Sequence, residues 1–256
     1  MLQTFYKYQG TGNDFIMIDD RKQKFPIDQE IIEKLCDRRF GIGADGLILL
    51  QEKDGIYQMV YFNSDGNRST MCGNGGRCFI RFMSDLKLIK DKVTFQAVDG
   101  LHSGEILDPF VKLQMQDVDE VKFEDSYTFM DTGSPHHIVY LDSLYDLDVK
   151  KEGAKIRYSE LYPEGTNVNF VQQLSPNRIE VRTYERGVED ETLSCGTGVT
   201  AAAISLVALE KSQMTDINVK TKGGNLKVNF LQQGDSYTDI ELIGPADFVF
   251  KGKIKI

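Results

Sequence analysis

The feature that most constrains the fold of this 256-residue chain is an internal repeat. One ungapped shift of 123 residues superposes the two halves, and self-similarity at a fixed offset indicates a duplicated unit. Chance matches between common glycines are the alternative, but the matches fall at equivalent places in the expected structure. We therefore predict two tandem copies of one domain. The pairs made identical by the shift are Cys72 and Cys195, Gly73 and Gly196, Gly75 and Gly198, Tyr61 and Tyr184, Gly10 and Gly133, and Asp19 and Asp142.

Many short strands and few helices are expected in both halves. In each half a polar linker, residues 64–70 or 187–193, leads into a Cys-Gly-x-Gly segment that opens a helix. These helices should extend to about Leu88 and about Glu210. The pattern predicts an α/β (α+β) fold.

Two further helices are expected, at residues 28–37 with Asp28 as N-cap and at 148–156. The C-terminal strand is left over from the second copy, so we expect it to return to the first. The predicted domains are residues 1–117 plus 247–256, carrying Cys72, and residues 118–246, carrying Cys195.

Composition excludes several functional classes. A net charge of −9 argues against general binding of nucleic acid or of an anionic membrane surface. The longest apolar stretch, 199–209, is too short to span a bilayer, and the N-terminus lacks the pattern of a secretory signal. The four cysteines form no C-x-x-C pair and the three histidines lack metal-ligand spacing, so we predict no metal site. A reducing cytoplasm with free thiols is the expected location.

The two Cys-Gly-x-Gly segments are the candidates for chemistry. A helix N-terminus presents unpaired N–H groups and about half a positive charge, which stabilises a thiolate and binds a carboxylate. One thiol and one anion site on each of two helices suit a symmetric reaction at a carboxylate-bearing carbon. Inversion of an α-carbon is such a reaction, because one group removes a proton and another returns one to the opposite face. Cys72 and Cys195 are therefore the predicted acid–base pair.

The segments around these two cysteines, together with five others, closely resemble those of diaminopimelate epimerase. The two signature segments are MCGNGGRC at 71–78 and YERGVEDETLSCGTG at 184–198. The likeness covers nearly the whole chain. The other segments that carry it are GTGNDF at 10–15, RRFGIGADGL at 38–47, FNSDG at 62–66, GSPHHIV at 133–139 and PEGTNVNF at 163–170.

The resemblance implies interconversion of LL- and meso-2,6-diaminoheptanedioate, a precursor of lysine and peptidoglycan, without cofactor or metal. It also implies a rolled mixed or antiparallel sheet around a central helix in each domain. The expected partner is a small amino-acid substrate. Family members are often dimers, and the sequence leaves the oligomeric state open.

The site residues that the resemblance implies fall into three groups. Cys72 and Cys195 match the catalytic cysteines, and His136 and Glu185 match positions that tune the thiols. Substrate-binding positions are matched by Asn13, Asn63, Gly73, Asn74, Asn167, Glu185, Arg186, Gly196 and Thr197. Gly46 and Ser134 depart from the polar residues that other members carry, which leaves substrate selectivity less well defined than reaction type.

Each motif also has a plain structural interpretation. Cys72 and Cys195 could be ordinary buried cysteines or form a disulfide, and we interpret Cys36 and Cys78 as core residues. Residues 41–46 fit G-x-G-x-x-G, but a helix before and a strand after is the wrong order for a dinucleotide site.

The polar candidates have similar alternatives. The adjacent histidines could be a metal fragment, although a hydrogen-bonding role for His136 fits better. Without the resemblance, Arg186 would be interpreted as a surface ion-pair residue and the three asparagines Asn13, Asn63 and Asn167 as turn residues.

Two rival functions remain. One is another cofactor-independent racemase, such as one acting on proline or hydroxyproline. The other is a non-catalytic amino-acid-binding protein of the same fold. Measuring deuterium exchange into each candidate amino acid distinguishes diaminopimelate epimerisation from another racemase activity. Substituting the cysteines distinguishes an enzyme from a binding protein.

Overall fold

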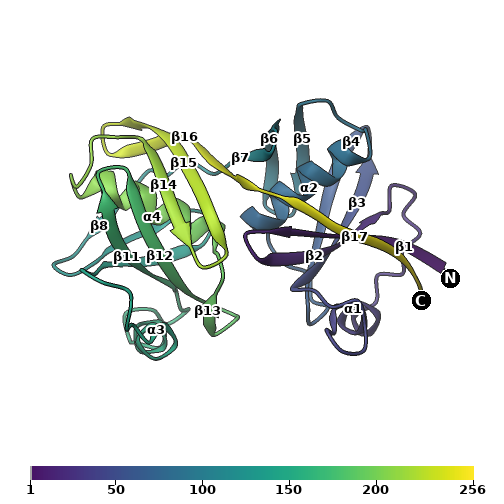
Figure 1. Ribbon diagram of the computed structural model, residues 1–256, viewed down its shortest axis with the longest axis horizontal. Helices are drawn as coiled ribbons and strands as arrows, with labels where there is room; N and C mark the ends of the chain where they lie inside the picture. Colours follow the sequence, from purple (N-terminus) through teal and green to yellow (C-terminus); the bar gives the residue numbers. More distant parts are fainter. Residues whose placement is uncertain (1) are drawn as a thin grey trace. The chain divides into compact units, whose positions relative to one another are not determined.

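The computed structural model describes residues 2–256, so residue 1 of the expected first domain lies outside the described part. Contacts group the chain into two compact units (Figure 1). Unit 1 comprises the residues up to Leu113 together with Gly244–Ile256, and unit 2 comprises Gln114–Ile243. We describe each unit by itself.

Unit 1 is one mixed sheet with two helices. Its strands pair in the order β17, β1, β2, β3, β4, β5, β6, β7, with parallel pairs only between β2 and β3 and between β4 and β5 among the described residues. The bounds are β1 Leu2–Gly10, β2 Asn13–Asp19, α1 Gln29–Cys36, β3 Gly46–Lys53, β4 Ile56–Asn63, α2 Gly73–Asp85, β5 Lys92–Ala97, β6 Gly100–Leu107, β7 Phe110–Gln114 and β17 Asp247–Lys255.

Unit 2 repeats this plan. Its strands pair in the order β8, β9, β10, β11, β12, β14, β15, β16, and β13 adds to β12. The bounds are β8 Lys122–Phe123, β9 Thr128–Asp131, β10 Pro135–Tyr140, α3 Val149–Arg157, β11 Asn167–Ser175, β12 Arg178–Glu185, β13 Asp190–Thr192, α4 Gly196–Ala208, β14 Asp216–Thr221, β15 Gly224–Gln233 and β16 Ser236–Pro245.

Each sheet wraps around one buried helix. In unit 1, α2 contacts β1, β2, β3, β6 and β17, and in unit 2, α4 contacts strands from β9 to β15 (Figure 1). All residues from Gly198 to Val207 of α4 are buried, which explains its alanine-rich sequence: small side chains let strands approach on every side. The predicted fold class, a rolled mixed sheet around a central helix in each of two similar halves, is confirmed.

The repeat is visible in strand register. Phe15 lies opposite Gly46 in the parallel pair of β2 and β3, and the residues 123 positions later, Ile138 and Asn169, lie opposite one another in β10 and β11. The hairpins that follow do not obey the single shift. Gly46 pairs with Asn63 in β3 and β4, whereas Asn169 pairs with Thr183 instead of Arg186 in β11 and β12. One ungapped shift therefore describes the strands and helices that position the cysteines, but not these hairpins.

All four expected helices form and begin within a residue of the expected position, and the two central ones end early. Asp28 caps α1 by accepting from the Ile31 N–H at 3.1 Å, and Asp148 caps α3 in the same way. Instead of reaching Leu88 and Glu210, α2 ends at Asp85 and α4 at Ala208. Lys87 and Glu210 adopt left-handed conformations, with φ of 60° and 55°, and such a residue terminates an α-helix. Within residues 2–256 no helix combines the length and apolar character that crossing a membrane needs.

Packing around α2 generates a stability prediction. Phe79 is fully buried on α2, with its ring 5.1 Å from that of Phe95. Phe79→Ala should lower the free energy of unfolding by about 3–5 kcal/mol, because it removes buried apolar surface and leaves a cavity. Urea denaturation followed by circular dichroism measures this change. The control is Phe40→Ala, which alters a side chain that is 82% exposed and should cost less than about 0.5 kcal/mol. Equal losses in the two variants would contradict the assignment of α2 as the core helix.

Candidate active site

Cys72 is the N-cap of α2. Its backbone is extended, with φ −110° and ψ 128°, and its carbonyl accepts from the Gly76 N–H at 2.7 Å. The thiol makes no capping bond to the helix, and no acidic residue occupies the first turn. The positive end of the helix dipole is therefore not neutralised from within the helix and can act on an anion beside Cys72.

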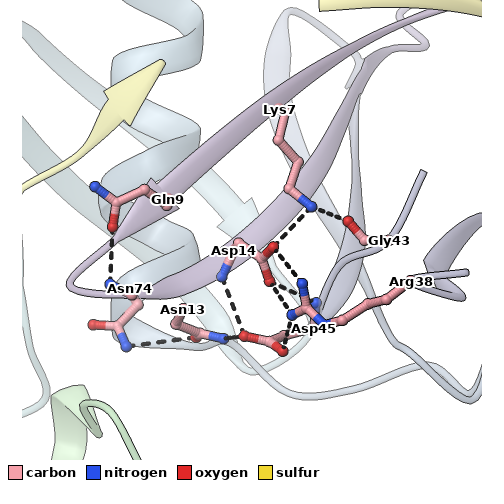
Figure 2. Close-up of polar contacts among 9 residues, drawn as sticks. Lys7, Gln9, Asn13, Asp14, Arg38, Gly43, Asp45 and Asn74 are labelled. Carbon is pink, nitrogen blue, oxygen red and sulfur yellow. Dashed lines mark hydrogen bonds and ion pairs between the residues drawn. The ribbon is translucent and has the colours of Figure 1, made fainter. Parts of the chain in front are cut away.

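Two asparagine amides lie beside this thiol. The Cys72 Sγ atom is 3.5 Å from Asn13 Oδ1, and Asn74 Nδ2 donates to the same oxygen at 3.5 Å. The other end of Asn13 donates through Nδ2 to Asp45 Oδ2 at 2.6 Å (Figure 2). Asn13 is thus held at both ends of its amide, with its oxygen toward the thiol.

An ion-pair network supports this asparagine. Arg38 binds both carboxylate oxygens of Asp14, at 2.6 and 2.9 Å, and also Asp45 at 2.8 Å (Figure 2). The ammonium of Lys7 pairs with Asp14 at 2.8 Å and donates to the Gly43 carbonyl. Burial opposes ionisation of Asp14, but the bonds from Arg38 and Lys7 outweigh it and lower its pKa to about 2. Asp14 therefore stays ionised throughout the physiological pH range.

Arg77 is a fully buried arginine one turn below the start of α2. It donates to the Gly73 carbonyl at 3.2 Å, to Asn74 Oδ1 at 2.9 Å and to Thr11 Oγ1 at 3.4 Å. Within residues 2–256 it makes no ion pair with a carboxylate. Burial lowers the pKa of Arg77 to about 10, against the partial opposition of Cys78 and Cys72, so the side chain remains a cation at neutral pH.

Cys195 is placed like Cys72, as the N-cap of α4. Its carbonyl accepts from the Val199 N–H at 2.8 Å, and the first turn of α4 again lacks an acidic residue. The neighbours differ, because the Cys195 Sγ atom lies 3.4 Å from the Thr197 hydroxyl. Thr200, which corresponds to Arg77 under the repeat, donates to the Gly196 carbonyl at 3.0 Å. A neutral hydroxyl therefore stands where unit 1 has a buried cation.

His136 is a neutral, fully buried imidazole near α4. Thr183 donates to Asn169 Oδ1 at 2.9 Å, which turns the Asn169 amide so that Nδ2 donates to His136 Nδ1 at 3.0 Å. The proton of the neutral ring must then sit on Nε2, which has no partner among the described residues. Burial, helped by the charge of Arg186, lowers the pKa of His136 to about 3. The imidazole is therefore an N–H donor at neutral pH.

Asn167, Arg186 and Glu185 lie at the adjacent strand ends. Asn167 Oδ1 accepts from the Arg186 N–H at 2.9 Å, and its Nδ2 donates to the Pro135 carbonyl at 3.1 Å. The exposed Arg186 guanidinium donates to the Glu164 carbonyl, and the Glu185 carboxylate accepts from the Thr192 hydroxyl at 2.9 Å. The guanidinium makes no carboxylate pair among residues 2–256, so its charge is available to an anion.

The predicted site residues divide between the two units. In unit 1, Gly73 and Asn74 lie in the first turn of α2 beside Asn13, and the exposed Asn63 ends β4. In unit 2, Gly196 and Thr197 start α4, and Asn167 begins β11 at the end where Glu185 closes β12. Cys36 and Cys78 are buried core residues, as predicted, and all four cysteines are free thiols.

Three polar residues of these groups escaped the sequence-based prediction. Arg77 and Asp45 lie inside the resembling segments but carry no signal that separates them from surface charges. Asn169 alternates with Asn167 along β11, and this two-residue spacing could have placed it on the face of Asn167. The departure at Gly46 has a steric reason, since a Cβ atom there would lie 2.5 Å from the Phe62 carbonyl oxygen.

Gly198 generates a prediction with a matched control. A Cβ atom at Gly198 would lie 2.3 Å from Asn169 Oδ1, so Gly198→Ala should displace the amide that orients His136. We expect a loss of roughly 1–3 kcal/mol in the free energy of unfolding, from disrupted buried hydrogen bonds. At Gly75, the equivalent in unit 1, a Cβ would meet only the ends of Ile48 and Met59 at 3.1 and 3.2 Å. Gly75→Ala should therefore cost less, and urea denaturation of both variants tests the order.

Buried histidines predict a pH dependence of stability. The ordinary pKa of histidine is about 6.5, whereas that of His136 is lowered to about 3, so between these values the unfolded state binds more protons. The contribution of His136 to the free energy of unfolding should be fully present above about pH 6.5. It should fall toward pH 3 by at most about 1.4 kcal/mol per pH unit. His137, whose pKa burial lowers to about 4, adds a similar term. His136→Gln should flatten the slope, and an unchanged slope in denaturation series would contradict the assignment.

Comparison with known proteins gives a consistent result. The family model described as diaminopimelate epimerase matches residues 5–121 and 128–249. A diaminopimelate epimerase of Flavobacterium psychrophilum is 57% identical over 253 residues, which cover 97% of this chain and 99% of that protein. One of Chlorobaculum tepidum is 42% identical over 260 residues, with 96% and 99% covered.

Solved structures are similar at much lower identity. A Bacillus anthracis phenazine biosynthesis protein of the PhzF family matches with a TM-score of 0.79 at 14% identity, covering 100% of both chains. A probable proline racemase from Agrobacterium radiobacter matches with a TM-score of 0.73 at 14% identity, covering 99% of this chain and 93% of that one. These likenesses establish the fold.

Proposed function

Because the chain belongs to the diaminopimelate epimerase family, and is thus an isomerase, we propose that it interconverts LL- and meso-2,6-diaminoheptanedioate by moving a proton between Cys72 and Cys195. The proposal rests chiefly on one observation. Each cysteine is the N-cap of a buried helix whose N-terminal turn carries neither a side-chain cap nor an acidic residue. We propose that the two units are the two epimerase domains.

The reaction needs two groups and no leaving group. One cysteine, as thiolate, takes the proton from the α-carbon, whose electron pair is delocalised into the adjoining carboxylate. The other cysteine, as thiol, returns a proton to the opposite face, and the two exchange roles in the reverse direction. Acid–base catalysis of this kind contributes roughly 10²–10⁴-fold. The remainder is assigned to the helix N-termini, whose N–H groups bind the carboxylate as negative charge builds on it.

The other predicted residues have roles that fit their chemistry. Gly73, Asn74, Gly196 and Thr197 supply helix-start donors to the reacting carboxylate. The exposed guanidinium of Arg186 is suited to a bidentate bond with the distal carboxylate of the substrate, and Asn13, Asn63, Asn167 and Glu185 bind its polar groups. His136 offers its Nε2–H, and with Glu185 it tunes the thiols.

The proposed setting is the biosynthesis of lysine and of peptidoglycan precursors in the cytoplasm, with no cofactor or metal and with a homodimer as the assembly. A second candidate substrate is proline or hydroxyproline, since a probable proline racemase and a hydroxyproline epimerase share the fold. Diaminopimelate is favoured by the 57% identity to an epimerase of that substrate, against 13–14% for the other two proteins.

Isotope exchange tests the function and the two thiols together. In heavy water the wild-type protein should incorporate deuterium at the α-carbon of LL-diaminopimelate and form the meso isomer. Cys72→Ser and Cys195→Ser should each slow isomerisation at least about 10²-fold, because serine is a far weaker acid than cysteine. Mass spectrometry and chiral chromatography measure the two products.

Cys36→Ser is the matched control, because Cys36 is buried in the core of unit 1 and lies outside the proposed site. It should retain near wild-type turnover. Exchange into proline but not into diaminopimelate would reject the substrate. Full turnover in either Cys72→Ser or Cys195→Ser would reject the two-thiol mechanism. A wild-type protein that binds diaminopimelate but exchanges no α-hydrogen would favour a binding protein of this fold.

A further inference from the structure

The amides beside Cys72 form a directed chain between two opposite charges. At one end the buried cation of Arg77 donates to Asn74 Oδ1 at 2.9 Å. Asn74 Nδ2 donates to Asn13 Oδ1, and Asn13 Nδ2 donates to the Asp45 carboxylate at 2.6 Å (Figure 2). Each amide therefore donates toward Asp45 and accepts from the side of Arg77.

The charges at the two ends determine which way each amide points. Rotating Asn74 by half a turn would place its N–H₂ group against the guanidinium of Arg77, which has only donors. Rotating Asn13 would place its oxygen against the carboxylate of Asp45, which has only acceptors. Both reversals replace a charge-assisted hydrogen bond with a repulsion between like groups. The orientation of Asn13 is thus set by Asp45, a residue to which the proposed mechanism gives no role.

This orientation determines what the Cys72 sulfur faces. The Sγ atom lies 3.5 Å from Asn13 Oδ1, an oxygen that can only accept. A thiol satisfies this oxygen by donating its proton, whereas a thiolate would face a lone pair. We infer that Asp45 is a positioning residue that, by holding Asn13 Oδ1 toward Cys72, keeps Cys72 as the protonated member of the pair in the resting enzyme and leaves Cys195 as the base.

The surrounding charges do not replace this interaction. Lys7 on β1 and Arg38 after α1 are paired with Asp14 on β2 and with Asp45, so their charges largely cancel. On α2, Arg77 is the unpaired cation, and burial keeps the neighbouring Cys78 thiol neutral by raising its pKa. Arg77 and the helix dipole favour a Cys72 thiolate, and the Asn13 oxygen opposes it.

Unit 2 has different residues at the equivalent positions. Under the repeat, Asn13 corresponds to His136 and Arg77 to Thr200. The His136 Nε2–H is a donor, and the Thr197 hydroxyl beside Cys195 can donate to a thiolate. The two halves therefore offer opposite partners: an acceptor oxygen beside Cys72 and hydrogen-bond donors near the start of α4.

The inference rests on the proposed two-thiol function and is tested by titrating each thiol separately. The full-length protein is alkylated with iodoacetamide from pH 5 to pH 10, and mass spectrometry quantifies Cys72 and Cys195 in their own peptides. Only the thiolate reacts, so the pH midpoint of each profile reports the acidity of that thiol. In the wild type, Cys72 should have the higher midpoint.

Asp45→Ala frees the Asn13 amide to turn its N–H₂ group toward a Cys72 thiolate. The Cys72 midpoint should then fall by about one pH unit, giving roughly tenfold faster alkylation below the midpoint, while the Cys195 profile stays unchanged. Asp45→Asn is the matched control, because it removes the same charge but retains an oxygen that can accept from Asn13. Its Cys72 midpoint should stay closer to the wild-type value.

Each outcome supports or overturns the inference. Equal shifts in Asp45→Ala and Asp45→Asn that vanish at high salt would show a general charge effect and overturn it, because exposed charges are screened. If Asp45→Ala does not fold, Asn13→Ala removes the oxygen itself and must lower the Cys72 midpoint. An unchanged Cys72 midpoint in a folded Asp45→Ala or Asn13→Ala variant, in a protein whose wild type epimerises normally, would overturn this inference alone. A wild-type protein that exchanges no α-hydrogen of diaminopimelate would instead overturn the proposed function.

Discussion

A cysteine at the N-cap of a buried helix is the arrangement on which the rest of this structure depends. The strands of each unit wrap around α2 or α4, so the helix start stays rigid and its N–H groups remain aimed at one point. A short exposed helix would fray at its end and could not hold an anion in a defined position. The rolled sheet is therefore more than a scaffold, because it preserves the electrostatic property that makes these thiols useful.

Duplication supplied this arrangement twice, and substitutions at equivalent positions then made the copies different. Unit 1 has a buried cation, Arg77, and an asparagine oxygen beside its thiol, whereas unit 2 has Thr200 and a neutral imidazole. In the proposed mechanism the two thiols alternate between acid and base, which needs one proton shared unequally between them. Different neighbours around two similar helix ends meet this need without altering the backbone that both copies share.

Much of the fold could be predicted from the chain because its signals are local. The caps at Asp28 and Asp148 and the glycines after each cysteine act within one turn of helix. The ends of α2 and α4 were predicted too far along the chain. The left-handed residues that follow them, such as Lys87, are not glycines, so the sequence does not mark these positions. The register of β11 and β12 also departs from the repeat, because the turn between them comes one residue earlier than the shift implies and a bulge adds to the offset.

The sequence by itself determined the repeat, the fold class, the two thiols and the family, because each depends on residue types at fixed spacings along the chain. Only the tertiary structure decided how the polar groups beside those thiols are oriented. Asn13, Asp45 and the α2 pair Asn74 and Arg77 come from three distant parts of the chain, and their direction of donation exists only once β2, α2 and the segment before β3 meet. A hydrogen bond depends on position and angle in space, and no pattern of residue types along a chain specifies either.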